Sequence, residues 1–248
     1  MSTIASPAVT SVLQNRREIA QGTMAFRFEK PPGWLFRPGQ CLDVTLIDPP
    51  ETDAEGNTRS FSIASGPGED SLMVATRMRD TAFKRVLKTM PIGASVTLEG
   101  PSGDLTLPED SARPVVFLAG GIGITPFRSM LVEAARASRE KPPHRMFLFY
   151  SNRRPEDSPF LAELRALEKQ NQRFTLIATM SDMASSQRPW SGETGLIDHL
   201  LLSRHLKATA SPVYYVAGPP PMVQALAGML KKQSVPDEDI HAEEFSGY

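Results

Sequence analysis

Short runs in which apolar and polar residues alternate fill the first part of the chain, up to Gly100. Successive side chains of a strand point to opposite faces, so this period of two predicts half-buried β-strands. Pro, Gly, Asn and Asp separate the runs, as they do at turns. The predicted strands are 8–19, 23–30, 41–50, 59–65, 71–79 and 95–100. Short strands at regular spacing favour a small antiparallel barrel or sandwich.

One helix interrupts these strands, at 81–90, with Thr81 as its expected N-cap and the 91–93 segment as its end. After Arg113 the pattern changes to apolar runs that alternate with amphipathic stretches. Buried strands are predicted at 114–120, 145–151, 173–180 and 212–218, and helices at 125–138, 158–170, 196–206 and 221–233. Such an alternation predicts a parallel sheet with helices on both faces.

The change of pattern lies within 108–114, and it divides the chain into two domains, 1–110 and 111–248. A chain of 248 residues is long enough for both. Its 40% hydrophobic and 22% charged residues are typical of a soluble globular protein. A net charge of −1 gives no sign of binding to nucleic acid or to an anionic membrane.

The first residues show no basic start followed by an apolar run, and no apolar stretch approaches the roughly 18 residues of a membrane span. We therefore expect a cytoplasmic protein without a membrane partner. Cys41 is the single cysteine, so the chain can form neither an intrachain disulfide nor a cysteine-ligated zinc or iron–sulfur site. The four histidines lack metal-ligand spacing, and we expect no metal. Any redox chemistry would then use an organic cofactor.

Two glycine-containing turns follow predicted strands of the parallel sheet, at 120–126 and 218–221. Glycines allow the backbone to approach a pyrophosphate, and a helix N-terminus offers unpaired N–H groups and the positive end of its dipole. Two such turns at one edge of a sheet favour nucleotide binding. The alternative for each is an ordinary tight connection between a strand and a helix.

Six segments together resemble the ferredoxin–NADP reductase-like flavin oxidoreductases. They are 36–40 (FRPGQ), 59–65 (RSFSIAS), 100–105 (GPSGDL), 120–126 (GGIGITP), 214–223 (YYVAGPPPMV) and 243–248 (EEFSGY), and they occur in the family's order. The resemblance implies two domains: an N-terminal antiparallel β-barrel, 1–110, that binds FAD, and a C-terminal α/β domain with a parallel sheet, 111–248, that binds NAD(P). The absence of cysteine-ligated sites suits a reductase without an iron–sulfur domain.

The resemblance also implies the flavin site. Arg59 would pair with the flavin diphosphate, the ring of Phe61 would lie against the isoalloxazine, and Ser62 would hydrogen-bond near N5. Phe61 replaces the family's usual tyrosine, so the phenolic hydrogen bond is lost. The segment 77–87 resembles the helix start that receives the pyrophosphate. The implied flavin contacts are Arg59, Ser60, Phe61, Ser62, Ile63, Thr76, Arg77, Thr81, Ala82 and Phe83.

The implied nucleotide contacts lie at the turns of the second domain, at Gly121, Gly123, Thr125, Pro126, Gly218, Pro219, Pro220 and Met222. Ser151, Asn152, Arg153 and Arg154 follow the second parallel strand, where an arginine accommodates a 2′-phosphate and an acid accepts from a 2′-hydroxyl. These donors favour NADPH, although Glu156 and Asp157 keep NADH possible. Gly192 and Gly195 fit a close approach to the nucleotide, whereas we expect Trp190 to cap the core.

The expected catalytic residues are Ser62, Thr125, Glu243 and Phe245, with Tyr248 as an alternative stacking ring. The implied reaction is hydride transfer from NAD(P)H to FAD, followed by electron transfer to a carrier protein such as ferredoxin or flavodoxin. Two alternatives stay open within the family, namely the reductase component of an oxygenase system and a non-catalytic electron-transfer subunit. A flavin-free nicotinamide dehydrogenase is a rival outside it. The sequence does not name the electron acceptor.

Overall fold

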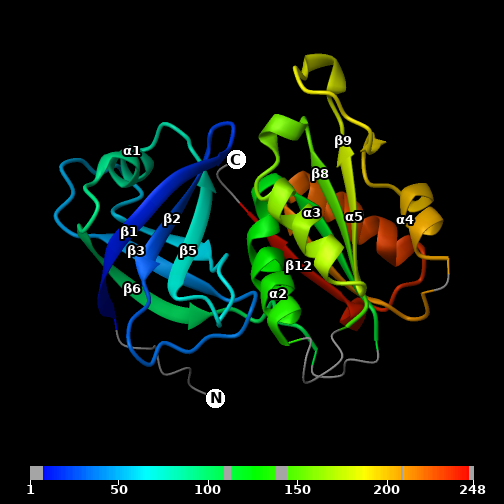
Figure 1. Cartoon of the computed structure of the whole chain (residues 1–248), viewed down its shortest axis with the longest axis horizontal. Coiled ribbons are helices and arrows are strands. Elements are labelled where there is room, and N and C mark those ends of the chain that lie inside the picture. The colour runs from blue at the N-terminus through cyan, green and yellow to red at the C-terminus, as the bar shows by residue number, and fades with distance from the viewer. Residues whose placement is uncertain (1–7, 109–112, 138–143, 208, 246–248) are drawn as a thin grey trace.

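A computed structural model describes residues 8–108, 113–137, 144–207 and 209–245 of the chain. Figure 1 shows two lobes side by side, each built on its own sheet, with the antiparallel lobe at the left and the parallel lobe at the right. This arrangement confirms the predicted fold class. The predicted domain boundary between 110 and 111 lies outside the described residues.

The first lobe is a six-stranded antiparallel sheet. Its strands are β1 (Val9–Ala20), β2 (Thr23–Glu29), β3 (Cys41–Leu46), β4 (Thr58–Ser62), β5 (Ser71–Arg77) and β6 (Ser95–Ser102), in the order β4-β3-β6-β1-β2-β5. The segment after β4 returns to the far edge, where the Ala64 N–H donates to the Met73 carbonyl at 2.7 Å. The Met73 N–H donates to Ser65 Oγ at 3.0 Å, so the two edges meet as in a barrel.

Apolar residues at alternate positions of these strands fill the inside of the barrel. Phe26, Phe28, Leu42 and Val44 are buried in this way, because every second side chain of a strand points inward. The helix α1 (Ala82–Thr89) covers one side and adds Phe83 and others to the same core. Thr81 is its N-cap, as predicted, and accepts from the Lys84 N–H.

The second lobe is a parallel sheet whose four inner strands are mostly buried, whereas its two edge strands are partly exposed. The strands are β7 (Val115–Gly120), β8 (Met146–Asn152), β9 (Phe174–Met180), β10 (Glu193–Thr194), β11 (Val213–Gly218) and β12 (Ile240–Glu244), in the order β10-β9-β8-β7-β11-β12. All the pairings are parallel. The edge strand β10 was not predicted, since only two residues pair there and leave no periodic pattern.

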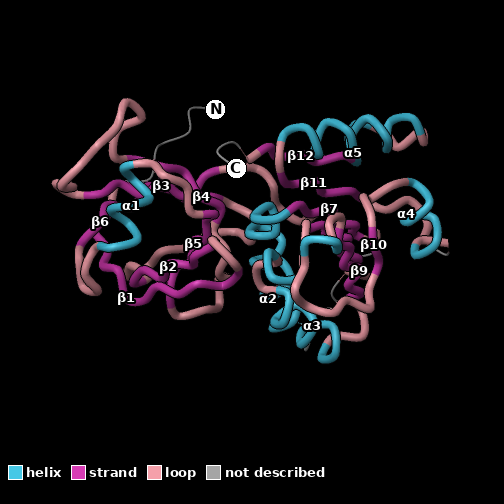
Figure 2. Tube along the Cα trace, turned by 90° about the horizontal axis from the view of Figure 1, so that it is seen from above, coloured by secondary structure: helices cyan, strands magenta, loops and turns pink. Residues whose placement is uncertain are grey.

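Helices cover both faces of the parallel sheet (Figure 2). The helices α2 (Ile124–Ala137) and α3 (Leu161–Gln170) share one face, and α4 (His199–His205) and α5 (Pro220–Lys232) share the other. These helices match the predicted segments to within a few residues. Short 3-10 turns lie at Gly121–Gly123, Pro155–Asp157, Met183–Ser185 and Asp237–Asp239. None of the described helices has the length and apolarity that crossing a membrane requires.

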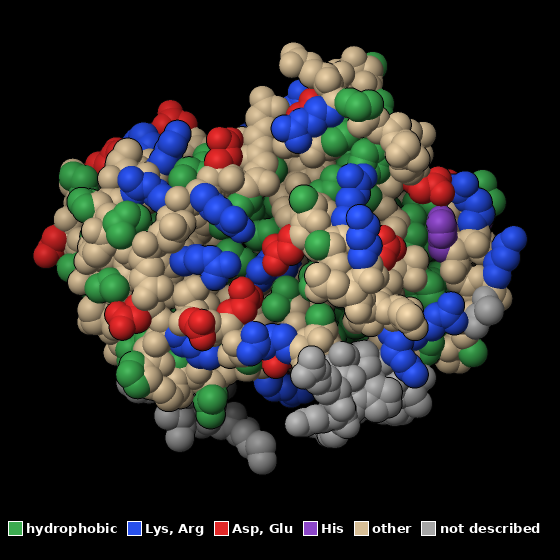
Figure 3. All heavy atoms as spheres, viewed as in Figure 1, with side chains coloured by type: hydrophobic (Ala, Val, Ile, Leu, Met, Phe, Trp, Pro, Cys, Tyr) green, Lys and Arg blue, Asp and Glu red, His purple; other side chains and the backbone are tan. Residues whose placement is uncertain are grey.

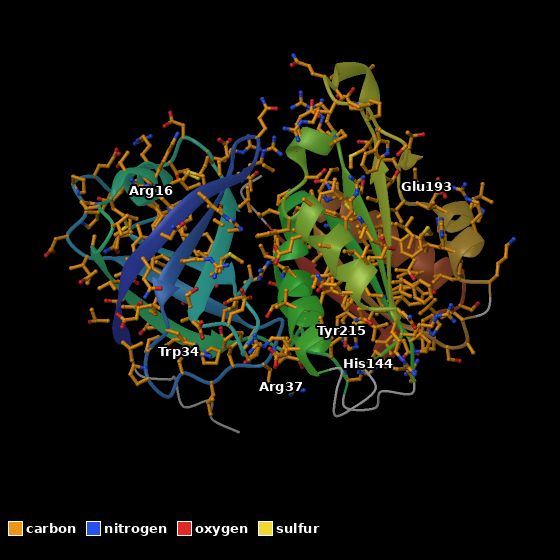
Figure 4. The ribbon with its side chains drawn as sticks, in the orientation of Figure 1. Arg16, Trp34, Arg37, His144, Glu193 and Tyr215 are labelled. Atoms are coloured by element: carbon orange, nitrogen blue, oxygen red, sulfur yellow. The ribbon has the colours of Figure 1, made fainter. Side chains whose placement is uncertain are left out.

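The two lobes share one apolar core where α2 packs on the barrel. Ala25, Met73 and Ala75 of the barrel cluster with Phe127 and Met130 of α2, and all of them are buried. Tyr215 of β11 lies at this junction (Figure 4), and its hydroxyl donates to the carbonyl of Thr106 in the connecting segment. Burial raises the pKa of Tyr215 to about 12, so its hydroxyl stays protonated as a donor. The junction is therefore packed like a domain interior.

Candidate functional site

A cavity of about 600 Å³ opens between the barrel and the parallel sheet. Both lobes contribute side chains that the sequence analysis selected. These residues are Arg59, Ser60, Phe61, Ser62, Thr76, Thr81, Thr125, Glu243 and Phe245. The fold thus gathers at one cavity residues that lie far apart in the sequence, and its volume is typical of a site for a small molecule or cofactor.

The barrel side of the cavity presents a short edge strand. β4 pairs with β3 in a register that places Ser62 opposite Cys41, and both residues line the cavity. The ring of Phe61 lies 5.9 Å from that of Phe83, centroid to centroid. Phe83 itself is buried in the barrel core, as are Ile63 and Ala82, so these three predicted contacts support the wall without lining the cavity. Arg77 does not line it either.

The opposite side of the cavity comes from the turn between β7 and α2. At Gly123 a Cβ atom would lie 2.3 Å from the carbonyl oxygen of Ala217, so only glycine allows this turn to reach the end of β11. That close approach brings Ile122 and Thr125 to the cavity. The hydroxyl of Thr125 donates to the Ile122 carbonyl at 3.0 Å, which leaves its oxygen able to accept.

The last strand supplies the remaining wall. β12 runs parallel to β11 with Glu243 beside Ala217, and the Phe245 N–H donates to the Gly218 carbonyl at 2.9 Å. The side-chain carboxyl of Glu243 has no hydrogen-bond partner among the described residues. Burial raises the pKa of its carboxyl above the ordinary value, because the charged form loses its hydration there. This side of the cavity therefore holds a carboxyl that ionises less readily than a fully hydrated one.

One end of the cavity is cationic. Arg59, Arg79 and Lys84 line it close to the first turn of α1. Burial, and then the positive charges of Arg79 and Arg59, lower the pKa of Lys84. These cations repel one another, and they lie next to the N-terminus of a helix. An anion bound there would therefore be stabilised.

The carboxylate of Asp53 connects two groups at this cationic end. Asp53 accepts from the Arg59 guanidinium at 3.2 Å and from the Ala82 N–H of α1 at 3.1 Å. Glu55 forms a second ion pair with Arg59, at 2.8 Å. Arg59 also donates to the carbonyls of residues 55, 56 and 58. Asp53 thus contacts the two groups that the sequence analysis assigned to a flavin diphosphate.

The predicted nucleotide contacts meet at the carboxyl edge of the parallel sheet. β8, β7 and β11 are neighbours, so the turns that follow them lie side by side. Gly121, Gly123, Thr125 and Pro126 follow β7, whereas Pro219, Pro220 and Met222 follow Gly218 at the end of β11. The hydroxyl of Tyr150 donates to the Gly121 carbonyl at 3.1 Å and steadies the first turn. Ser151 and Asn152 end β8 at this edge, and the buried Asn152 Nδ2 has no partner among the described residues.

The two arginines after β8 are both held by carboxylates. Arg153 donates to Asp182 at 2.8 Å, and its side chain is 72% exposed. Arg154 makes two hydrogen bonds to the buried Asp157, at 2.7 and 2.8 Å. Asp157 and Arg154 thus form a tight pair within one turn. Neither guanidinium is a free cation.

A larger groove, of about 1130 Å³, runs between the β1–β2 hairpin, the start of α3 and the loop 187–191. Among the described residues, Arg154 is the only predicted site residue that lines it, so its size does not make it the better candidate. On the face drawn in Figure 3, basic and acidic side chains are interspersed along the junction of the two lobes.

Trp190 packs against the main core and donates from its indole to the Glu193 carbonyl at 2.8 Å, as expected for a core cap. A Cβ at Gly192 would meet the Trp190 ring at 2.5 Å, so that glycine serves this packing. Gly195 has φ +95°, and its N–H donates to the Met180 carbonyl. Tyr248 lies outside the described residues.

Several cavity residues were not among the contacts predicted one by one from the sequence, although two of them, Arg79 and Lys84, belong to the segment 77–87 expected to receive the pyrophosphate. They are Cys41, Glu55, Ala75, Arg79, Lys84, Ile122 and Glu244. The cations near the start of α1 carried a weak signal, because basic residues flank a helix start there. Asp53 and Glu55 gave no such signal in the sequence, since acidic residues in a polar loop are common on any protein surface.

Comparison with known proteins agrees with this geometry. Residues 117–228 match the model of the oxidoreductase NAD-binding domain. The chain is 30% identical over 222 residues to the propane 2-monooxygenase reductase component of Mycolicibacterium goodii, a match that covers 88% of the chain and 61% of the relative. It is 29% identical over 225 residues to the propane 2-monooxygenase reductase component of Rhodococcus jostii, over 88% of the chain and 57% of that relative.

Solved structures show the same fold across both lobes. The Amycolatopsis cytochrome P450 reductase GcoB superposes with a TM-score of 0.79 at 22% identity, over 96% of this chain and 70% of that one. The ferredoxin-NADP+ reductase of Plasmodium falciparum gives 0.75 at 15% identity, over 96% of each chain. The chain therefore has the two-lobe fold of these reductases, in agreement with its resemblance to the ferredoxin–NADP reductase-like oxidoreductases. It spans about three fifths of the length of the propane monooxygenase reductases that it matches.

Glu243 provides a test of the site's electrostatics. Its pKa is raised in the folded state, so it ionises at lower pH in the unfolded chain, and stability falls as pH rises through that window. Glu243→Gln removes this loss. We expect the variant to unfold at a higher temperature than the wild type at about pH 7 and at the same temperature at about pH 4. Equal differences at both pH values would contradict a buried, unpaired carboxyl.

Proposed function

We propose that this chain is a flavin-dependent reductase that takes a hydride from a nicotinamide nucleotide and passes the electrons to a protein acceptor. The observation that carries the proposal is the shared cavity. It brings Phe61 and Ser62 of the barrel to the same space as Thr125 and Glu243 of the parallel lobe. Hydride transfer needs two rings held in contact, and a cavity between the two lobes is suited to that task.

The cavity fits a flavin, and we propose FAD as the bound form. Two aromatic side chains and the hydroxyl groups of several serines and threonines line the cavity, which suits a flat ring with polar edges. The cationic end beside α1 suits a diphosphate. To bind there, a diphosphate has to share or replace the contacts of Asp53 with Arg59 and the Ala82 N–H.

A bound flavin would supply the hydride-accepting ring and the ability to release electrons one or two at a time. The chain's residues would position the reactants and exclude water. Phe61 and Phe245 offer apolar walls, and Ser62 offers a hydroxyl that lines the same cavity. Glu243, whose pKa is raised by burial, can hold a proton beside them.

The relatives favour an oxygenase component as the electron acceptor. Propane 2-monooxygenase reductase components from Mycolicibacterium goodii and Rhodococcus jostii are among the similar sequences, and a ferredoxin reductase of carbazole 1,9a-dioxygenase is among the similar folds. We propose that this chain reduces a protein of such a system. A carrier such as ferredoxin or flavodoxin is the second candidate.

For the nucleotide, the ion pairs after β8 favour NADH over NADPH. The preference for NADPH inferred from the sequence rested on Arg153 and Arg154 as cations available to a 2′-phosphate. In the folded chain Asp182 and Asp157 bind these arginines, and Glu156 lies 3.7 Å from Arg154. Three carboxylates therefore outweigh two guanidinium groups. At these arginines a 2′-phosphate would have to compete with a carboxylate already bound, whereas a 2′-hydroxyl can donate to Asp182.

The proposed function predicts that the purified protein binds FAD without a covalent bond and is yellow. Anaerobic addition of NADH should bleach the flavin absorbance without a second protein, and an oxygenase component or ferredoxin should restore it. A protein that binds neither FAD nor FMN would end the flavoenzyme proposal. Bleaching that requires a partner protein would instead support a subunit that is inactive alone.

Arg59→Ala should weaken flavin binding. The change removes a charge-assisted contact to phosphate of about 1.5–3 kcal/mol, which corresponds to roughly ten- to a hundredfold in the flavin Kd. Fluorescence titration of the flavin-free protein measures this Kd. Arg145→Ala is the control, because Arg145 lies over the Phe147 ring at the start of β8, at the other edge of the sheet. Equal affinities for wild type and Arg59→Ala would remove Arg59 from the site.

Asp182→Ala should shift the nucleotide preference toward NADPH. The change frees Arg153 for a charge-assisted bond to a 2′-phosphate, so we expect kcat/KM for NADPH to rise about tenfold relative to NADH. Steady-state kinetics with both nucleotides measure the ratio. Asp237→Ala, which breaks an ion pair with Lys231 before β12, is the matched control and should leave the ratio unchanged. A wild type that prefers NADPH would overturn the assignment.

A further inference from the structure

A buried arginine on α2 ties the parallel lobe to the barrel. The side chain of Arg128 is only 3% exposed. It donates to the Ala64 carbonyl at 2.6 Å and to Glu69 of the barrel at 2.9 Å. It also donates to Glu163 of α3 at 2.6 and 3.0 Å. The guanidinium of Arg128 thus connects α2 both to the barrel and to α3.

Neighbouring residues of α2 continue this connection along the same barrel segment, 64–69. The hydroxyl of Ser129 donates to the Ser65 carbonyl at 2.6 Å. The carboxylate of Glu133 accepts from the Gly68 N–H at 3.0 Å. Glu69 in turn accepts from the Gly66 N–H at 2.7 Å, which closes the segment into a compact turn. The helix and the turn are therefore cross-linked at several points.

The charges of this junction are balanced. Arg128 and Arg27 face Glu69, and Arg128 also faces Glu163. Although burial by itself opposes the charged forms, the guanidinium of Arg128 keeps the pKa of Glu69 below its ordinary value, and the two carboxylates raise that of Arg128. The face of Phe160 lies 5.2 Å from the guanidinium carbon. A buried charge of this kind is held in one geometry, because moving it away would leave carboxylates unpaired.

The same residues adjoin both halves of the cavity. Ala64 follows the cavity residue Ser62 by two positions, and Arg128 follows the cavity residue Thr125 by three. Arg128 itself does not line the cavity. A displacement at the Arg128 contact would therefore shift Ser62 relative to Thr125 without removing any group from the cavity wall.

We propose that Arg128 is a positioning residue, which sets the separation between the flavin half and the nucleotide half of the cavity. The proposal rests on the proposed reductase function. Hydride transfer depends steeply on the distance between the reacting atoms, and a misplacement of about 1 Å costs roughly a hundredfold in rate. Binding of each cofactor by its own lobe depends far less on that distance.

Arg128→Lys tests this role while it retains the charge. A lysine ammonium cannot donate in a planar fork to the Ala64 carbonyl, Glu69 and Glu163 together. We expect the rate of flavin reduction by NADH in single-turnover experiments to fall roughly ten- to a hundredfold, with the Kd of flavin and of NADH unchanged. With NADH deuterated at the transferred position, the kinetic isotope effect on turnover should rise, because the chemical step becomes slower.

Amide hydrogen exchange of the flavin-free protein provides a second readout that does not depend on activity. Arg128→Lys should speed exchange at Gly66 and Gly68, whose N–H groups belong to the cross-linked turn. Arg128→Met, with similar length and no charge, should enlarge both effects. Arg113→Lys is the matched control, because Arg113 makes two bonds to Asp239, which also belongs to the parallel lobe. It should change neither the reduction rate nor the exchange.

The outcomes separate this proposal from the proposed function. A wild type that binds no flavin, or whose flavin NADH does not reduce, would overturn the reductase function itself. A reducible wild type with an equally fast Arg128→Lys variant would overturn the positioning role, even if exchange at Gly66 increased. A variant whose cofactor Kd values rise as steeply as its reduction rate falls would assign Arg128 to binding and also contradict the proposal.

Discussion

The packing of α2 on the barrel is the contact that creates the site. Each lobe has its own sheet and most of its own core, but the cavity exists only between them. Met73 and Ala75 of the barrel and Phe127 and Met130 of α2 are buried together, so the junction is as dry as a domain interior. Interfaces within a chain are usually small and polar enough to allow relative motion. An apolar junction that also encloses Arg128 holds the lobes in one arrangement.

Charge within the cavity is arranged along its length. The cations beside α1 lie at one end, and the half-buried Glu243, whose carboxyl has no partner among the described residues, lies on the wall contributed by β12. Positive charge favours an anion at the first place, and burial raises the pKa of the carboxyl at the second, because the surroundings differ in hydration and in nearby charge. The two parts of the cavity therefore differ in their electrostatics.

Much of the fold could be predicted because it depends on local patterns. Alternation of apolar residues predicted the barrel strands, and continuous apolar runs predicted β7, β8, β9 and β11. Six of the ten flavin contacts expected from the sequence line the cavity, since short motifs at strand ends carry their own geometry. Phe83 and Ile63 were chosen with them but support the wall from inside the barrel. The side of a strand or helix that faces a cavity is decided by packing, which a single motif does not reveal.

Patterns along the chain were enough to predict the two sheets and the turns at the carboxyl edge of the second. Which carboxylate pairs with which arginine is decided only in the folded chain. Arg153 and Arg154 form a cationic pair in the sequence, yet Arg153 meets Asp182, which is 29 positions away. That pairing follows from β8 and β9 lying side by side, which brings the segments after their carboxyl ends together. Electrostatic free energy depends on the distance between charges in space. A sequence therefore shows which residues are charged but not which of them form pairs.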